Sequence, residues 1–142
     1  MIKAFLFIRL VHFLLAANQI DNVVEVDVNY WENGVKNQQV EVLLHKQDKN
    51  VFVDSINDAR KMNDEKIIRT KPSLTINILS NEGDYEAYEL WITSDGTGYM
   101  QTLDPSGGGT FELSKASVKE LAEFLKTKGK EDVVQDDVEF EE

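Results

Sequence analysis

The side chains that could do chemistry in this chain are carboxylates, because the sulfur and imidazole groups of many active sites are nearly absent. The sequence holds 26 acidic residues, two histidines and no cysteine. His12 and His45 lie far apart in dissimilar contexts, which argues against a histidine metal cluster or a catalytic triad. The absence of cysteine excludes disulfides, thiolate ligands and thiol nucleophiles. We therefore expect no metal and no cofactor.

Carboxylate pairs such as Glu86/Glu89 and Asp95/Asp104 have the residue types of a glycosidase acid and base. That chemistry requires two carboxylates at a fixed separation in a cleft, one of them with a raised pKa. Nothing in the sequence marks either pair as buried. Asp95 and Asp104 could also bind calcium weakly, but no EF-hand spacing surrounds them. In so acidic a chain such pairs arise by chance, so we interpret them as solvated surface groups and expect no enzyme.

The run Ser106-Gly107-Gly108-Gly109 invites comparison with a phosphate-binding loop. Such a loop requires a following Lys-Ser/Thr and opens a helix. Here the next residues, Thr110 to Leu113, resemble a short strand. The run is therefore interpreted as a flexible hairpin or hinge.

The charge of the whole chain limits its partners. With 15 basic residues against 26 acidic ones, the net charge is −11. Such a surface repels phosphate backbones and anionic lipid headgroups, so we expect no nucleic-acid binding and membrane contact only through an N-terminal segment. The length and the hydrophobic fraction of 42% fit one globular domain, expected to be a monomer.

Residues 1–17, MIKAFLFIRLVHFLLAA, have the layout of a secretory signal: a basic start, an apolar run and terminal small residues. The apolar run is shorter than the roughly 20 residues that span a bilayer. Leu15-Ala16-Ala17 resembles the end of a lipoprotein signal, but Asn18 stands where the lipidated cysteine would be. The alternative is that this stretch is the first buried helix or strand of the fold. The expected location is extracytoplasmic, secreted or membrane-associated.

The remaining chain predicts an α+β domain over residues 18–129. Alternating β-branched residues from Val24 and from Gln38, separated by Glu-Asn-Gly, predict an N-terminal β-hairpin. A helix is predicted from Asp48 to Met62. Strands at 73–80, 85–93 and 99–103, with a short fourth at 110–113, predict an antiparallel meander. A second helix begins at Ser114 or Ser117 and ends at Gly129. We expect one antiparallel sheet packed against these two helices.

Residues 130–142 carry a dense run of acidic side chains. Such a run repels itself and buries little, so it is interpreted as an acidic disordered tail. The alternative is a docking peptide built on Val138 and Phe140.

The most promising binding residues lie on the second strand of the meander. Strand alternation places Trp91 on the face opposite Leu90 and Ile92, together with Tyr85 and Glu89. If the last helix covers the Leu90 face, Trp91 and Tyr85 stand on an open face, where aromatic side chains are favoured interface anchors. The alternative is that the N-terminal segment or the first hairpin covers this face and Trp91 belongs to the core.

The order of these elements resembles the YhfM-like domain of small secreted lipoproteins of Gram-positive bacteria. The matching stretches are FVDSINDA (Phe52 to Ala59), YELW (Tyr88 to Trp91) and TFELS (Thr110 to Ser114), which leads into Val118–Leu125. The resemblance spans roughly residues 23–128 and implies an exported, membrane-tethered domain with no established activity. Such lipoproteins carry a cysteine where this chain has Asn18. This difference concerns the lipid tether and not the expected fold.

Two functional hypotheses follow. The first is a non-enzymatic, extracytoplasmic, lipoprotein-like domain that binds an envelope protein or a ligand through its sheet face, with Trp91, Tyr85 and Glu89 as the contact residues. The second is an acidic inhibitor or immunity-type protein that masks a basic partner, because acidity steers association with cationic surfaces.

Overall fold

A computed structural model describes residues 20–63, 66–103 and 109–141, and in these ranges the chain is an α+β fold with one open antiparallel sheet. The strand order is β2-β1-β5-β6-β7-β8-β4, with β3 also paired to β1. The eight strands are β1 (Val23–Glu32), β2 (Val35–Lys36), β3 (Glu41–Leu43), β4 (Arg60–Lys61), β5 (Leu74–Ser80), β6 (Tyr85–Ile92), β7 (Gly98–Thr102) and β8 (Thr110–Glu112). The predicted fold class is confirmed.

The N-terminal hairpin and the meander form a single sheet because β1 pairs with β5 from Val23 to Tyr30. On its other side β1 turns through Asn33-Gly34 into β2 and then pairs with β3. Asn33 and Gly34 both have positive φ, the conformation of a tight hairpin turn. The predicted hairpin is thus correct in outline, but its second strand is divided into two short pieces.

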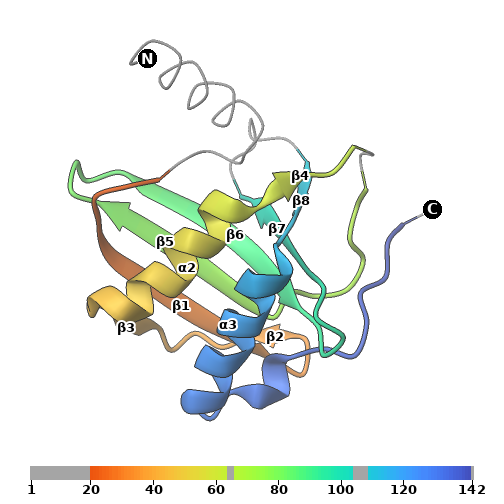
Figure 1. The fold of residues 1–142 in the computed structure, drawn as a ribbon. Helices are drawn as coiled ribbons and strands as arrows, with labels where there is room; N and C mark the ends of the chain where they lie inside the picture. The colour runs from red at the N-terminus through yellow and green to blue at the C-terminus, as the bar shows by residue number, and fades with distance from the viewer. Residues whose placement is uncertain (1–19, 64–65, 104–108, 142) are drawn as a thin grey trace.

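Helices α2 (Lys46–Asp58) and α3 (Lys115–Thr127) both lie on one face of the sheet (Figure 1). Helix α3 begins where the Ser114 hydroxyl accepts a hydrogen bond from the Ser117 amide, so Ser114 is the N-cap. Helix α2 begins earlier than predicted, after His45, and ends at Asp58 because Ala59 is already extended. The next two residues form β4, which pairs with β8.

The core fills the space between the two helices and the sheet. Phe52 of α2 and Phe124 of α3 meet edge to face, with their ring centroids 5.2 Å apart. Beneath them lie fully buried strand residues, including Val28, Ile76 and Leu90. Burial of these apolar side chains supplies most of the folding free energy.

The chain after α3 is not a disordered tail in the structure, so that expectation is wrong for residues 130–141. A short 3₁₀ helix (Glu131–Val133) inserts Val133 into the core. Residues 134–141, called the C-terminal segment below, then cross to the face of the sheet opposite the helices. The acidic side chains of this segment stay exposed, while Val138 is buried. Ordering therefore requires no burial of charge.

Residues 1–17, with the predicted signal-like segment, and Asn18 lie outside the described residues. The same holds for Asp104 and for residues 106–108 of the glycine run. No helix in the described part of the chain is both long and apolar enough to span a membrane.

Candidate binding surface on the helix-free face

The face of the sheet opposite the helices is organised in rows that run across the strands. Directly paired residues of antiparallel strands share a face, so the register shows which side chains are neighbours. One row contains Glu25, Leu79 and Tyr85. The next contains Val42, Asp27, Asn77 and Ala87. A third contains Asn29, Thr75, Glu89, Gln101 and Thr110. Trp91 and Tyr99 belong to a fourth.

The three predicted contact residues do share this face, but they lie in three different environments. Trp91 is only 2% exposed, whereas Tyr85 is 60% exposed and Glu89 lies half-buried between them. The expectation that Trp91 stands on an open face is therefore wrong. The face is divided, and only one part of it is accessible.

The part around Trp91, called the covered half below, lies under two chain segments. The Trp91 indole Nε1 donates a hydrogen bond of 2.8 Å to the carbonyl of Thr70. The neighbouring Tyr99 ring meets Phe140 of the C-terminal segment edge to face, at 5.2 Å between centroids. Residues 67–71 and the C-terminal segment thus form a lid over these two aromatic rings. The alternative that Trp91 belongs to the interior is therefore correct, and among the described residues the segments over it include residues 67–71 and the C-terminal segment.

The two covering segments are joined to each other and to the sheet by backbone hydrogen bonds. The Arg69 amide donates to the Glu139 carbonyl at 2.8 Å, and the Glu141 amide donates to the Ile67 carbonyl at 2.8 Å. At the other end the Gln135 amide donates to the Ile92 carbonyl at 2.8 Å. The lid is therefore an ordered extension of the fold, not a loose end of chain.

The row that contains Glu89 marks the border of the lid, and its polar side chains are largely paired. Thr75 accepts a hydrogen bond of 2.8 Å from the Trp31 indole, and Gln101 donates to Thr110 at 2.9 Å. Burial raises the pKa of Glu89, and the nearby cations Lys36 and Lys71 oppose that rise. Glu89 thus serves as a partly desolvated border residue.

The opposite part of the face, called the open half below, has no cover among the described residues. It consists of Glu25, Asp27, Val42, Leu79, Tyr85 and Leu103. Val42 is 49% exposed and Leu103, whose amide donates to the Ala87 carbonyl, is 46% exposed. Val42 lies beside Asp27, whereas Tyr85 is two strands from Glu25 and Leu103 follows β7. Exposed apolar and aromatic side chains on one sheet face are typical of a contact surface.

Glu25 and Asp27 are neighbours on this half because they are two residues apart on the same strand. A hydrogen bond between the two carboxyl groups raises the pKa of Glu25, and their mutual repulsion adds to the effect. One carboxylate oxygen of Asp27 is buried without a hydrogen-bond partner. Neither residue takes part in the ion pairs found in the described part of the chain, which use Glu32 and Glu41. Two acidic groups are therefore left without a cation.

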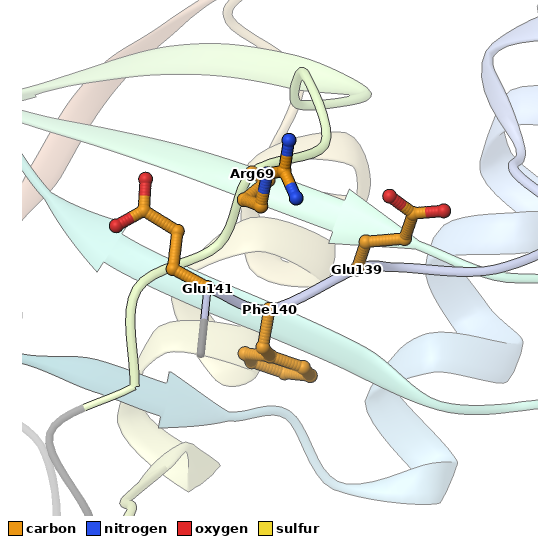
Figure 2. Close-up of a pocket in the computed structure, with 4 residues that line it drawn as sticks. All are labelled: Arg69, Glu139, Phe140 and Glu141. Carbon is orange, nitrogen blue, oxygen red and sulfur yellow. The ribbon is translucent and has the colours of Figure 1, made fainter.

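A hollow of about 670 Å³ lies on the outer side of the lid and is lined by Arg69, Glu139, Phe140 and Glu141. In Figure 2 the three charged side chains point to one side of the C-terminal segment, whereas Phe140 points to the other side. The hollow is shallow, and its single cation stands between two carboxylates. It lacks the apolar walls that enclose a small-molecule ligand.

A smaller hollow of about 160 Å³ lies at the β5–β6 turn. Its lining includes four carboxylates, those of Asp21, Glu82, Asp84 and Glu86, and no cationic side chain. No group of three or more metal-ligating side chains occurs in the described ranges. This hollow is therefore acidic, but its carboxylates are not arranged as a group of metal ligands.

Of the carboxylate pairs considered from sequence, Glu86 and Glu89 do not lie together, and the pair Asp95/Asp104 is described only for Asp95. Glu86 pairs with Ile78 on the helix side of the sheet, so it lies on the face opposite Glu89. Asp95 is held in the β6–β7 turn by Thr93 and Thr97, whose hydrogen bonds lower its pKa to about 2. Its proposed partner Asp104 is outside the described residues. His45 is exposed at the start of α2.

Sequence reasoning missed the contribution of Val42, Glu25 and Asp27 to the candidate surface. Glu25 and Asp27 occupy the outward positions that the alternation of β1 predicts. The apolar alternation of residues 38–44 is wrong for β3, because Leu43 is buried and Val42 is 49% exposed. The sequence did not show which strands lie next to each other. β3 and β5 flank β1 only in the folded sheet, and this arrangement brings Val42 beside Asp27 and Leu79 beside Glu25.

Comparison with known proteins adds no relative, since no family model, curated protein or solved structure matches this chain. The resemblance to the YhfM-like domain stays a prediction.

Proposed function

We propose that this chain is a non-enzymatic binding domain that contacts another protein through the open half of its helix-free sheet face. The single observation that carries this proposal is the exposure of Tyr85 and Val42 on the same patch. Tyrosine is enriched among residues that dominate binding energy, because its ring buries a large area at a low entropic cost. The extracytoplasmic location expected from residues 1–17 is part of the same proposal.

The division of the face supports this choice of surface. The covered half already has an intramolecular partner in its lid, so its aromatic side chains are satisfied within the fold. On the open half the apolar side chains remain in contact with water, at a cost of about 25 cal/mol for each Å² of apolar surface that a partner could cover. A partner therefore gains more by binding there than anywhere else on this face.

Site-specific photo-crosslinking in the native host tests the proposal. A benzophenone side chain at position 85 should give one covalent adduct, which mass spectrometry identifies and purified components then reproduce. The same group at Asp54, an exposed position on α2, is the control. Equal adducts at both positions, or none at position 85, would contradict the proposal. Cell fractionation tests the location, and intact protein confined to the cytoplasm would refute that part.

The inhibitor hypothesis remains the second candidate and is tested by the same adduct. It requires the identified partner to be a basic enzyme whose activity falls in the complex. A partner whose activity is unchanged would exclude the inhibitor role and leave the binding role intact.

A further inference from the structure

We propose that the open half receives an arginine or lysine side chain of a protein partner, which lies between Glu25 and Asp27 with apolar residues on either side. This inference rests on the proposed function and specifies the chemistry of its partner. It has two structural grounds: the unneutralised carboxylates, and the apolar side chains that flank them.

The first ground is charge. Glu25 and Asp27 share one strand face, and neither has a cation within ion-pair distance in the described part of the chain. A guanidinium group supplies several donors in a planar fork and pairs with carboxylates in two-point contacts. One cation would also relieve the repulsion between the two acids.

The second ground is the apolar frame. Asp27 is directly paired with Val42 of β3, and Glu25 with Leu79 of β5. Adjacent strands lie about 4.8 Å apart, so each carboxylate has one aliphatic neighbour directly beside it, while Asn77 of β5 lies on the other side of Asp27. The methylene stem of arginine or lysine packs on such surface while its head reaches a charge. Tyr85, directly paired with Leu79, adds a ring on which a guanidinium group can stack.

The same charges disfavour a second copy of this chain as the occupant. In a two-fold dimer the same patch meets itself, which would bring two Glu25 and two Asp27 side chains together. Repulsion between like charges at an interface opposes such an association. A cationic partner avoids this cost and benefits from the net charge of −11 during association.

The test is a titration of the full-length, ¹⁵N-labelled protein with three defined peptides, followed by NMR at 50 and 300 mM NaCl. The peptides are acetyl-VRVRVRV-amide, its glutamate analogue acetyl-VEVEVEV-amide, and acetyl-SRSRSRS-amide, which keeps the charge and removes the apolar groups. We expect the first peptide to shift signals of the open half, the second to shift none, and the third to bind about tenfold more weakly. Screening should weaken the first complex at the higher salt.

Matched variants separate a built site from general acidity. The double variant Glu25→Gln/Asp27→Asn should weaken binding of the valine–arginine peptide about tenfold. The control Asp54→Asn/Asp58→Asn removes the same charge from exposed positions of α2 and should leave the affinity unchanged. Equal weakening by both double variants would overturn the inference, because the attraction would then come from net charge alone.

Other occupants give distinct results. Shifts in the open half that depend on protein concentration without peptide would show a second copy, and contacts from residues 1–19 would show the chain's own segment. Either result overturns the inference. If no peptide binds while the position-85 adduct forms with an identified partner, the cationic chemistry is wrong and the binding function stands. If peptides bind as expected and no such adduct forms, the proposed function fails by its own test.

Discussion

The two halves of the helix-free face share one sequence feature but differ in their exposure to solvent. Both halves carry an aromatic side chain at an outward position of β6, Trp91 in one and Tyr85 in the other. Trp91 is 2% exposed beneath the lid, and Tyr85 is 60% exposed. An outward aromatic residue on a strand is therefore not by itself evidence of a binding site. What covers it decides between core and contact surface.

The difference between the halves also separates stability from binding. Side chains under the lid contribute to folding because their burial is intramolecular. Side chains on the open half contribute little to folding, and their burial is available to a partner. The following predictions test this division, beginning with the largest expected effect.

Replacement of the two aromatic residues should give very different losses of stability. Trp91→Ala removes a buried indole and its hydrogen bond to Thr70, so we expect a loss of about 3–5 kcal/mol in the free energy of unfolding. Tyr85→Ala should cost less than about 1 kcal/mol, since its ring is exposed. Urea denaturation of both variants measures the difference. Similar losses would mean that the two halves do not differ in burial.

Loosening the lid should have a smaller effect. Phe140→Ala removes the ring that packs on Tyr99, and we expect a loss of about 1–2 kcal/mol in unfolding free energy. Hydrogen exchange of the Glu139 and Glu141 amides, which are bonded to Thr70 and Ile67, should accelerate. Glu139→Ala keeps the backbone bonds and should change neither quantity. Unchanged exchange in Phe140→Ala would show that the ring does not hold the lid.

At the border, Glu89→Gln should stabilise the protein slightly at neutral pH. The pKa of Glu89 is raised in the folded state above its ordinary value of 4.5, so the folded protein binds this proton more tightly than the unfolded chain does. Folding stability contributed by the protonated carboxyl group is therefore lost as the pH rises above 4.5. The variant should therefore gain less than about 1 kcal/mol at pH 7, a value reduced for solvent screening, and nothing below pH 4.5. Thermal unfolding across this range, with Glu120→Gln on α3 as control, measures the effect. A gain that persists at low pH would point to another cause.

In the open half, Asp27→Asn should return the pKa of Glu25 towards its ordinary value of 4.5. The raised pKa means that the folded protein holds this proton more tightly than the unfolded chain does. The pair therefore opposes folding as pH rises above 4.5, and the variant should remove that dependence. Carboxyl NMR titration of Glu25 measures the change. An unaltered pKa would show that Asp27 is not its cause.

Local sequence pattern was sufficient for most of the strands and, in β5 and β6, for the face on which each residue lies. In β3 it was not, because Val42 of the apolar alternation is exposed and Leu43 is buried. The alternation through Thr75, Asn77 and Leu79, and through Tyr85, Ala87 and Glu89, correctly places these residues away from the helices. Ser114 is the N-cap of α3, one of the two positions that its sequence allows. These features depend on residues within one turn or one strand, and a local pattern records them directly.

The lid could not be predicted from the acidic composition of residues 130–142. A signal was nevertheless present, since Val138 and Phe140 alternate with Asp137, Glu139 and Glu141 as in a half-buried strand. Composition suggested disorder because it records the number of charged side chains and not the face of the segment on which they lie. In the structure the charges face water and the apolar side chains face the protein, so the segment folds without burying a carboxylate.

The sequence by itself determined the α+β class, the alternation of β1, β5 and β6, the acidic surface and the presence of an outward aromatic pair on β6. Only the tertiary structure decided which member of that pair is core and which is accessible. The hydrogen bond between Glu139 and Thr70 joins residues 69 positions apart, and the pairing of β1 with β5 is similarly remote. Periodicity is a property of a few consecutive residues. Whether a side chain is covered depends on contacts between segments that are distant in sequence, so a local pattern does not show which face of a strand is buried.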